Sequence, residues 1–457
     1  MQVPGLSVGI VADDLTGACD TALQFFSTHA ETHVLVDLAR GRVDEQLTPH
    51  DMKGNVVWSV NTSTRNGTSY EAEARVRQAV ALYRDRFGVE HFYKKVDSTL
   101  RGHIAHECLG MLEELRAQCA VIVPAYPSEG RRTVGGYQLV RGIPVERTVV
   151  ARDPLFPVRQ SHLPTLLEQA TRPEIVGYVP LAQVLHGAGP ILLKLKELIQ
   201  EGRKLIVVDA TNDEDLKQIA LAIEKVRKYA QVVPCGSAGL ARALAALWSG
   251  ELDESEEAIK APSLLVAPSP VLMVLGSNTE TTRQQIRKLM EYYNYYGLDS
   301  QLEVFEPTPL QLLGLESCDE LIVRMGAALG ERNTVVVSSA LMEDSYARTL
   351  TLAHEHGLSD SQASQAVQET LAKLASELAR MYTFKLILGG GETTCQVCDA
   401  LNIRTLQLLA EVEPAIPLSV DASGRWLVTK SGGFGSPMVL ANAVRFIKQR
   451  ESASVHV

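Results

Sequence analysis

Short runs of β-branched residues alternate along this chain with longer stretches of helical periodicity, and this alternation limits the folds that it can adopt. Runs such as 7–12 and 120–124 have the length of a strand that is buried on both faces of a sheet. Stretches such as 213–229 repeat their apolar residues at the helical spacing. Strands that alternate with helices build βαβ units and parallel sheets, so the sequence predicts an α/β protein.

The alternation runs through two halves of the chain. In the first half we expect strands at 7–12, 33–37, 56–60, 92–95, 120–124, 174–179 and 205–209, and helices at 15–26, 70–87, 104–117, 191–200, 213–229 and 238–248. In the second half we expect strands at 271–276, 334–338, 384–388 and 426–430, and helices at 279–293, 361–382 and 438–449. Between the halves, an acidic cluster followed by three prolines indicates a linker.

These boundaries predict two domains, residues 1–250 and 271–457, joined by the linker 251–270. A chain of 457 residues is long enough for each domain to bury a core of its own. Ligands of open parallel sheets bind at the carboxyl ends of the strands. We therefore expect two α/β domains with mainly parallel sheets that face each other across a cleft.

Composition narrows the classes of function. The formal net charge of −10 argues against a broad surface for nucleic acid, although a local basic pocket stays compatible with it. No window approaches 18 uninterrupted apolar residues, and Asp13 and Asp14 break the first apolar run. We therefore expect no membrane span and no secretion signal. Because the 7 cysteines are scattered, unlike a disulfide framework, we expect a protein of the reducing cytoplasm.

Two carboxylates follow the first predicted strand directly. Asp13 and Asp14 stand at a strand-to-helix turn, where a single Asp would be enough to cap the helix. A second adjacent carboxylate adds repulsion without improving the cap, so we interpret the pair as part of a site. The next predicted strand end carries Arg65 within a polar run, residues 61–65.

A third strand end gathers opposite charges within a few residues. Lys95, Asp97 and Arg101 lie here with the hydroxyls of Ser98 and Thr99, before a predicted helix whose free N–H groups favour an anion. This set suits an anionic ligand with several hydroxyl groups, while the alternative is a capped helix beside a solvated run of charges. The long stretch 124–161 that follows is punctuated by Gly and Pro, and we expect an ordered loop that covers the cleft.

Glycines and serines follow four predicted strands of the second half, at 276–277, 338–339, 389–391 and 431–435. Consecutive glycines let the backbone come close to a phosphate and direct N–H groups toward it. Each run alone is equally compatible with a tight turn, but the four ends together favour a nucleotide-phosphate site. The chain contains no Gly-Lys dipeptide and hence no P-loop, so phosphate binding would depend on glycine backbone, helix ends and Mg²⁺.

Four motifs together resemble those of the four-carbon acid sugar kinases. They are VADDLTGA at 11–18, KVDSTLRG at 95–102, GGET at 390–393 and SGGFG at 431–435. The resemblance covers nearly the whole chain in the same order. It implies an N-terminal domain that binds the acid sugar, a C-terminal domain that binds ATP, and phosphorylation of a hydroxyl of threonate, erythronate or a 3-oxo-tetronate with ATP and Mg²⁺.

The resemblance also assigns residues to the two ligands. The residues that it implies for the acid sugar and its chemistry are Asp13, Asp14, Arg65, Lys95, Asp97, Ser98, Thr99 and Arg101. The residues that it implies for ATP are Ser277, Gly390, Gly391, Glu392, Thr393, Gly433 and Gly435. We expect Asp14, Asp97 and Lys95 to be catalytic, with one of the two aspartates as the base for the attacking hydroxyl. At least one of Arg65 and Arg101 should bind the carboxylate of the substrate.

The sequence is also compatible with two other classes of function. An aldolase or a dehydrogenase acting on similar acids would use Lys95 as a Schiff-base lysine or the glycines for a dinucleotide, although no G-x-G-x-x-G opens the first βαβ unit. A non-catalytic sensor would bind the acid without ATP turnover. Neither the metal ligands, nor the identity of the acid, nor the oligomeric state follows from the sequence, and a homodimer is among the open alternatives.

Overall fold

The computed structural model describes residues 6–26, 30–38, 55–153, 155–249, 269–331 and 333–454. The chain divides into two compact units, Met1–Asp253 and Glu254–Val457. Most of the predicted linker, residues 251–268, lies outside the described residues. The cleft between the domains stays a prediction.

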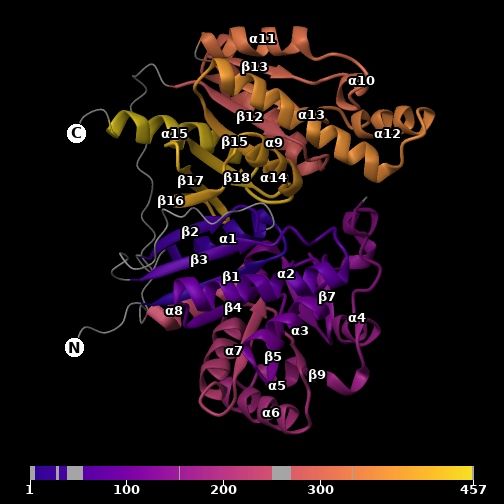
Figure 1. Ribbon diagram of the computed structural model, residues 1–457, viewed down its shortest axis with the longest axis vertical. Helices are drawn as coiled ribbons and strands as arrows, with labels where there is room; N and C mark the ends of the chain where they lie inside the picture. The colour runs from indigo at the N-terminus through magenta and orange to yellow at the C-terminus, as the bar shows by residue number, and fades with distance from the viewer. Residues whose placement is uncertain are drawn as a thin grey trace. The chain divides into compact units, whose positions relative to one another are not determined.

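A parallel sheet of eight strands, counted over the described residues, forms the centre of the first unit (Figure 1). Its strand order is β2-β3-β1-β4-β11-β5-β10-β9, and every neighbouring pair is parallel. Because β1 lies between β3 and β4, the residues that follow these three strands meet at one edge of the sheet. The strands are β1 (Ser7–Ala12), β2 (Glu31–Leu35), β3 (Val56–Asn61), β4 (His91–Lys95), β5 (Cys119–Val123), β9 (Val176–Val179), β10 (Leu205–Val208) and β11 (Val232–Gly236).

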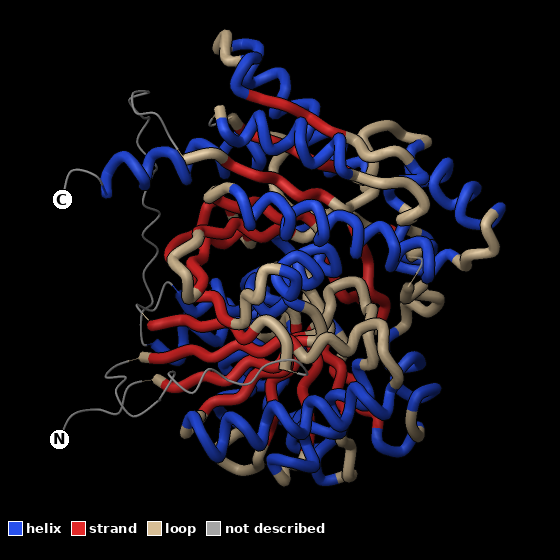
Figure 2. The backbone as a smooth tube through the Cα atoms, turned by 45° about the horizontal axis from the view of Figure 1, so that its top comes forward, coloured by secondary structure: helices blue, strands red, loops and turns tan. Residues whose placement is uncertain are grey.

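Helices cover both faces of this sheet, as a fully parallel sheet requires (Figures 1 and 2). The connection from β1 to β2, which contains α1, runs across the sheet in one direction, and the connection from β3 to β4, which contains α2, runs in the opposite direction. Because such crossovers are right-handed, α1 and α2 lie on opposite faces of the sheet. The α2, α3 and α4 helices share one apolar core, whereas α1 packs on α8 and α8 on α7. The helices are α1 (Leu15–Phe26), α2 (Ser69–Leu82), α3 (Ile104–Leu115), α4 (Leu163–Ala170), α5 (Leu181–Val184), α6 (Ala188–Gln200), α7 (Asp213–Val226) and α8 (Ala238–Ser249).

The long stretch after β5 is ordered, as its Gly and Pro punctuation predicts. The strands β6 (Arg131–Val134), β7 (Tyr137–Val140) and β8 (Ile143–Pro144) form a small antiparallel sheet. Gly135 and Gly136 form the β6–β7 turn with φ of 61° and 76°, values that favour glycine. Whether this hairpin covers a cleft stays a prediction.

Asp209 connects this hairpin to the main sheet. Its carboxylate accepts hydrogen bonds from the N–H groups of Gly135 at 2.8 Å and Gly136 at 3.0 Å. It also accepts one from the Tyr178 hydroxyl at 2.6 Å and one from the Leu181 N–H at 3.0 Å. Because Asp209 is 1% exposed, removing it would leave four donors without their partner.

A mixed sheet forms the centre of the second unit, with the strand order β13-β14-β12-β15-β18-β17-β16 (Figure 1). The first five strands in this order are parallel, and β17 and β16 continue the sheet antiparallel. The strands are β12 (Val271–Leu275), β13 (Leu302–Phe305), β14 (Thr334–Ser338), β15 (Lys385–Gly389), β16 (Thr405–Glu413), β17 (Ile416–Asp421) and β18 (Trp426–Lys430).

The helices of the second unit form two groups. The α9 and α15 helices share an apolar core with one face of the sheet, whereas α13 packs with α11, α12 and α14. The helices are α9 (Glu280–Tyr295), α10 (Pro309–Leu312), α11 (Asp319–Gly330), α12 (Ser345–Glu355), α13 (Asp360–Met381), α14 (Gly391–Ala400) and α15 (Val439–Ser454).

The structure corrects several expected elements. The strand β11 was not expected, because Pro234 and Gly236 interrupt its β-branched run, yet both lie buried within the sheet. Nor were β13 and the β16–β17 hairpin expected, although the burial along β16 alternates as in a half-buried strand. The expected helix 70–87 ends as an α-helix at Leu82 and continues through a π-helical turn to Phe87.

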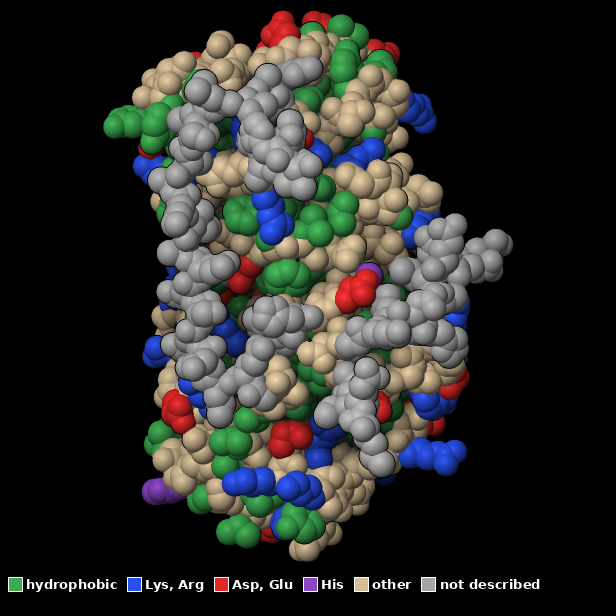
Figure 3. Space-filling model, turned by 90° about the vertical axis from the view of Figure 1, so that its left-hand side faces the viewer, with side chains coloured by type: hydrophobic (Ala, Val, Ile, Leu, Met, Phe, Trp, Pro, Cys, Tyr) green, Lys and Arg blue, Asp and Glu red, His purple; other side chains and the backbone are tan. Residues whose placement is uncertain are grey.

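No helix among the described residues is both long enough and apolar enough to cross a membrane. On the face that Figure 3 shows, basic and acidic side chains are interspersed and do not gather into a field of one sign.

We predict that Asp209→Ala lowers the free energy of unfolding by roughly 3 kcal/mol, because four donors lose a charged acceptor that is buried. Urea unfolding followed by fluorescence measures the change. Asp213→Ala, at an exposed position in the first turn of α7, is the control and should change the free energy by less than about 1 kcal/mol. Equal effects of the two substitutions would contradict the role of Asp209 as an anchor.

Candidate active site

Three neighbouring strands of the first unit bring the predicted residues to one edge. Asp13 and Asp14 follow β1, Arg65 lies four residues beyond β3, and Asp97 lies two residues beyond β4. The backbone fixes this arrangement, since the N–H groups of Thr64 and Arg65 donate to the Asp13 carbonyl at 3.1 Å and 3.3 Å. The parallel register therefore joins segments that are far apart in sequence.

Arg65 lies at the centre of a buried cluster of charges. Its Nε and Nη2 donate to both carboxylate oxygens of Asp13, at 2.7 Å and 3.0 Å, in a bidentate pair. The same Nη2 donates to Asp14 Oδ1 at 2.7 Å and lies 3.7 Å from Asp97 Oδ1. One guanidinium thus compensates three carboxylates, none of them more than 8% exposed.

Neighbouring charges control the protonation of this cluster. Burial alone would raise the pKa of Asp13, but Arg65, Lys94 and Lys95 outweigh it and lower that pKa below its usual range. The pKa of Asp97 is likewise raised by burial but held well below its usual range by Arg101, Arg65 and Lys95. Both carboxylates therefore stay ionised at neutral pH.

Asp97 also organises the loop that follows β4. Its Oδ2 accepts from the N–H of Thr99 at 3.3 Å, from the Thr99 hydroxyl, and from the N–H and Nε of Arg101 at 3.3 Å and 3.0 Å. Arg101 Nη1 continues to Asp153 Oδ2 at 3.2 Å. Asp97 therefore fixes the position of Arg101, and neither Asp153 nor this connection was evident from the sequence.

The two lysines of β4 have different surroundings. Lys94 is fully buried and forms an ion pair with Glu107 of α3 at 2.9 Å, which makes it a structural charge. Lys95 forms no ion pair with any described carboxylate, although it is only 4% exposed. Its Nζ lies 2.9 Å, and Asp14 Oδ1 2.5 Å, from the point where a Cβ on Gly17 would stand. Because Gly17 has no side chain, the Lys95 ammonium and the Asp14 carboxylate can both lie next to its Cα.

Ser98 and Thr99 are buried beside these charges. The Ser98 carbonyl accepts a hydrogen bond from Gln138 Nε2 at 2.6 Å, so the β6–β7 hairpin contacts the site within the first unit. Gly102 has φ of 88°, and a Cβ there would lie 2.6 Å from Asp13 Oδ2. The structure thus brings the eight residues predicted for the acid sugar together and adds Gln138, which the sequence did not indicate.

In the second unit, the loops after β12, β15 and β18 lie next to one another, because these strands are neighbours. A Cβ on Gly390 would lie 3.5 Å from the Ser277 nitrogen, and one on Gly276 would collide with Thr393 Oγ1. A Cβ on Gly432 would collide with Ser277 Oγ. The close contacts at Gly276 and Gly432 therefore require glycine at these two positions.

The remaining residues predicted for the nucleotide have different environments. Glu392 lies in the first turn of α14, and the N-cap of that helix, Gly390, provides no side-chain hydrogen bond. A Cβ on Gly433 would have no neighbour within 4 Å, so this glycine borders open space. Gly435 has φ of 88° and lies against Val439, so local packing alone explains why it is glycine.

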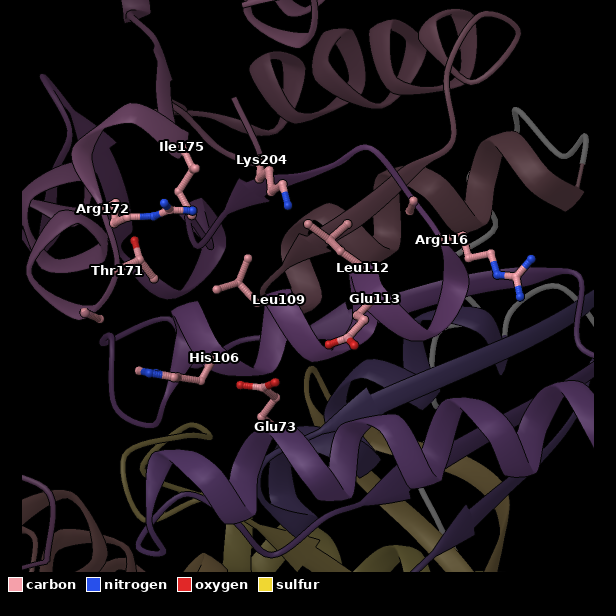
Figure 4. Close-up of a pocket in the computed structure, with 12 residues that line it drawn as sticks. Glu73, His106, Leu109, Leu112, Glu113, Arg116, Thr171, Arg172, Ile175 and Lys204 are labelled. Carbon is pink, nitrogen blue, oxygen red and sulfur yellow. The ribbon is translucent and has the colours of Figure 1, made fainter. Parts of the chain in front are cut away.

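The pocket in Figure 4 lies elsewhere in the first unit. It has a volume of about 680 Å³ and is lined by residues of α3 together with Arg116, Arg172 and Lys204. None of the residues predicted for the acid sugar or the nucleotide lines it. Its charged side chains lie near the surface, and we assign it no part in the reaction.

Two family models match successive parts of the chain. Residues 8–244 match the family model of a sugar-binding N-terminal domain, and residues 272–440 match that of a nucleotide-binding C-terminal domain. The chain is 32% identical to the D-threonate kinase of Bordetella bronchiseptica, over 98% of each chain. It is 28% identical to the D-erythronate kinase of Heliobacterium modesticaldum, over 96% of this chain and 98% of that protein. It is 29% identical to the 3-oxo-tetronate kinase of Methylobacterium radiotolerans, over 94% of this chain and 96% of that protein.

We predict that Arg65→Met lowers the free energy of unfolding by about 3–5 kcal/mol at pH 7, because three buried carboxylates lose their common cation. In the wild type, the depressed pKa values of Asp13 and Asp97 give stability that is present above their ordinary pKa near 3.8 and is lost only below it. In the variant, Asp13 loses the cation that lowers its pKa most, so burial should raise that pKa, whereas Arg101 still lowers the pKa of Asp97. The deficit should therefore shrink from pH 7 to pH 5 as Asp13 becomes protonated. Urea unfolding at several pH values measures it.

Arg77→Met is the matched control. Arg77 pairs with Glu113 at 3.0 Å, but its side chain is 42% exposed, so its loss should change the free energy of unfolding by less than about 1 kcal/mol. This small change should also be independent of pH between 5 and 7. An Arg65→Met variant as stable as Arg77→Met would contradict the central role of the guanidinium.

Proposed function

Because this chain belongs to the four-carbon acid sugar kinase family, we propose that its first unit binds the acid and its second unit binds ATP. The chain is a phosphotransferase that acts on a four-carbon sugar acid of the threonate, erythronate or 3-oxo-tetronate type. The observation that carries the assignment of roles is the buried cluster around Arg65, which lies within the part matched by the sugar-binding family model.

Arg101 is the residue that we assign to the carboxylate of the substrate. Arg65 already donates three hydrogen bonds to Asp13 and Asp14, and it therefore shapes the pocket. The Arg101 side chain is 26% exposed, and its planar guanidinium can donate two parallel hydrogen bonds to a carboxylate. Lys95, whose ammonium has no carboxylate partner among the described residues, supplies a second positive charge for the acid or for the transferred phosphoryl group.

Asp14 is the base that this proposal favours over Asp97. Each oxygen of Asp97 already accepts from Arg101, and the pKa of Asp97 is held well below its usual range, which makes it a weak proton acceptor. Asp14 Oδ2 accepts from the Thr16 hydroxyl at 2.6 Å, a neutral donor that a substrate hydroxyl can replace. Asp14 would then orient the attacking hydroxyl and take up its proton.

The glycine loops of the second unit are the proposed nucleotide site, with Ser277, Gly390, Gly391, Glu392, Thr393, Gly433 and Gly435. The backbone N–H groups at the start of α14 favour an anion there. Mg²⁺ bound to ATP would neutralise charge on the phosphate oxygens. Among the described residues no three His, Cys, Asp or Glu side chains gather as a metal site, so we assign Mg²⁺ no set of protein ligands.

We predict that the wild-type enzyme releases ADP from Mg-ATP with at least one stereoisomer of a tetronate or 3-oxo-tetronate. A coupled ADP-release assay over all stereoisomers measures this, with the uncharged tetritol of the same configuration as the control. The kcat/KM for the acid should exceed that for the tetritol by about 100-fold or more, because the tetritol leaves Arg101 without its partner. No ADP release with any acid would overturn the function, and equal turnover of the tetritol would overturn the role of Arg101.

We predict that Asp14→Asn lowers kcat by about 10²–10⁴-fold, because the amide cannot accept the hydroxyl proton. Asp97→Asn should instead raise the KM of the acid, since it releases Arg101, and should lower kcat much less. Steady-state kinetics of both variants at saturating ATP separates the two effects. Near-normal kcat in Asp14→Asn, or the reverse order of the two variants, would contradict the assignment of the base.

A further inference from the structure

Lys430 is a buried ammonium group that the site described above does not use. It ends β18 and is 2% exposed. Its one hydrogen-bond partner among the described residues is the Gly432 carbonyl, at the long distance of 3.5 Å, and no carboxylate of those residues lies within 4.0 Å of it. Burying a charge without a counter-charge costs free energy, so an anion bound beside Lys430 would stabilise its ammonium group.

The charged residues on the surrounding elements are engaged elsewhere or form no ion pair with Lys430. Arg283 pairs with Glu280 at the start of α9, and Lys385 of β15 pairs with Glu451. Glu413 of β16 accepts from Ser436 and Asn442, and Glu392 of α14 has an interaction partner of its own. Burial is therefore what lowers the pKa of Lys430 to about 8. An anion that binds beside it would raise that pKa again.

The loop after β18 holds one peptide group in a fixed orientation. The Gly432 carbonyl accepts from Thr279 Oγ1 at 3.0 Å and Thr282 Oγ1 at 3.2 Å, in addition to Lys430. A trans peptide directs its N–H away from its C=O, so the Gly433 N–H points away from these donors. This N–H has no partner within the described part of the chain, and Gly433 borders open space.

We propose that Lys430 and the Gly433 N–H bind a terminal phosphate of the nucleotide. This inference rests on the proposed function and extends it to a residue outside the motif assignments. Lys430 would then do for this chain what the lysine of a P-loop does elsewhere, with the glycine loop and the start of α14 as the backbone donors. The phosphate of the bound nucleotide would then be the counter-charge that compensates the burial of the Lys430 ammonium group.

The test compares Lys430→Met with Lys385→Met in the full-length protein. Titration calorimetry with ATP and with ADP should give a Kd at least about tenfold higher in Lys430→Met, because a charge-assisted hydrogen bond is lost. The KM of the acid at saturating ATP should stay within about twofold, and the Tm should stay equal or rise, since Met removes a buried charge. Lys385→Met, on β15, should match the wild type in both affinities.

A second measurement needs no variant. At pH 8.5 the ammonium of Lys430 is partly deprotonated in the free enzyme, and bound phosphate should restore its proton. Calorimetry of ADP binding in buffers of different ionisation enthalpy should therefore detect proton uptake. The phosphates of ADP are fully ionised at this pH and do not contribute. Lys430→Met should abolish the uptake, whereas Lys385→Met should retain it.

The outcomes separate this inference from the function on which it rests. Unchanged ATP affinity in Lys430→Met, or no proton uptake by the wild type at pH 8.5, would overturn the role of Lys430 while the kinase activity stands. Absence of ADP release by the wild type with every acid would overturn the proposed function itself, whatever Lys430 binds. A lower Tm together with unchanged ATP affinity would make Lys430 a structural residue and would equally overturn the inference.

Discussion

The guanidinium of Arg65 is the interaction on which the site of the first unit depends. Three carboxylates at neighbouring strand ends would repel one another and could not all be buried without it. By donating to Asp13 through two hydrogen bonds and to Asp14 through a third, Arg65 fixes their orientation before any substrate binds. The loop that follows β3 therefore determines the geometry of the loop that follows β1.

The same principle extends outward from this centre. Lys94 is compensated by Glu107, whose other oxygen accepts from Thr64, the residue before Arg65. Arg101 connects Asp97 to Asp153 in the long stretch after β5. Lys94 and Arg101 thus have partners on other elements of the first unit. A displacement of α3 or of that stretch would therefore disturb the carboxylates through Glu107 or Arg101.

Much of this arrangement could be predicted from the sequence, because it depends on strand ends. The alternation of strands and helices gave the parallel sheet, and the order of the motifs placed Asp13, Arg65 and Asp97 at strand ends. The sequence could not predict which charged side chains already form ion pairs within the protein. Lys94 and Lys95 are adjacent and identical in type, but Glu107 pairs with Lys94, whereas Lys95 has no carboxylate partner in the part of the chain that the structure describes. Likewise, β11 was missed because its strand contains Pro234, which β-propensity disfavours but the pairing accommodates.

The two units treat charge in opposite ways, and this difference bears on how such an enzyme would distinguish its substrates. In the first unit, protein groups compensate most charges. Under the proposed assignment, the acid would have to replace existing partners of Arg101, and its recognition would depend on geometry more than on net attraction. In the second unit, Lys430 has no carboxylate partner among the described residues, so a phosphate bound there, as proposed, would interact with an ammonium group that is already buried away from water. A site of the first kind selects one acid among similar ones. A site of the second kind selects for phosphate charge, which every nucleoside triphosphate carries, so discrimination of the base must come from other residues of the second unit.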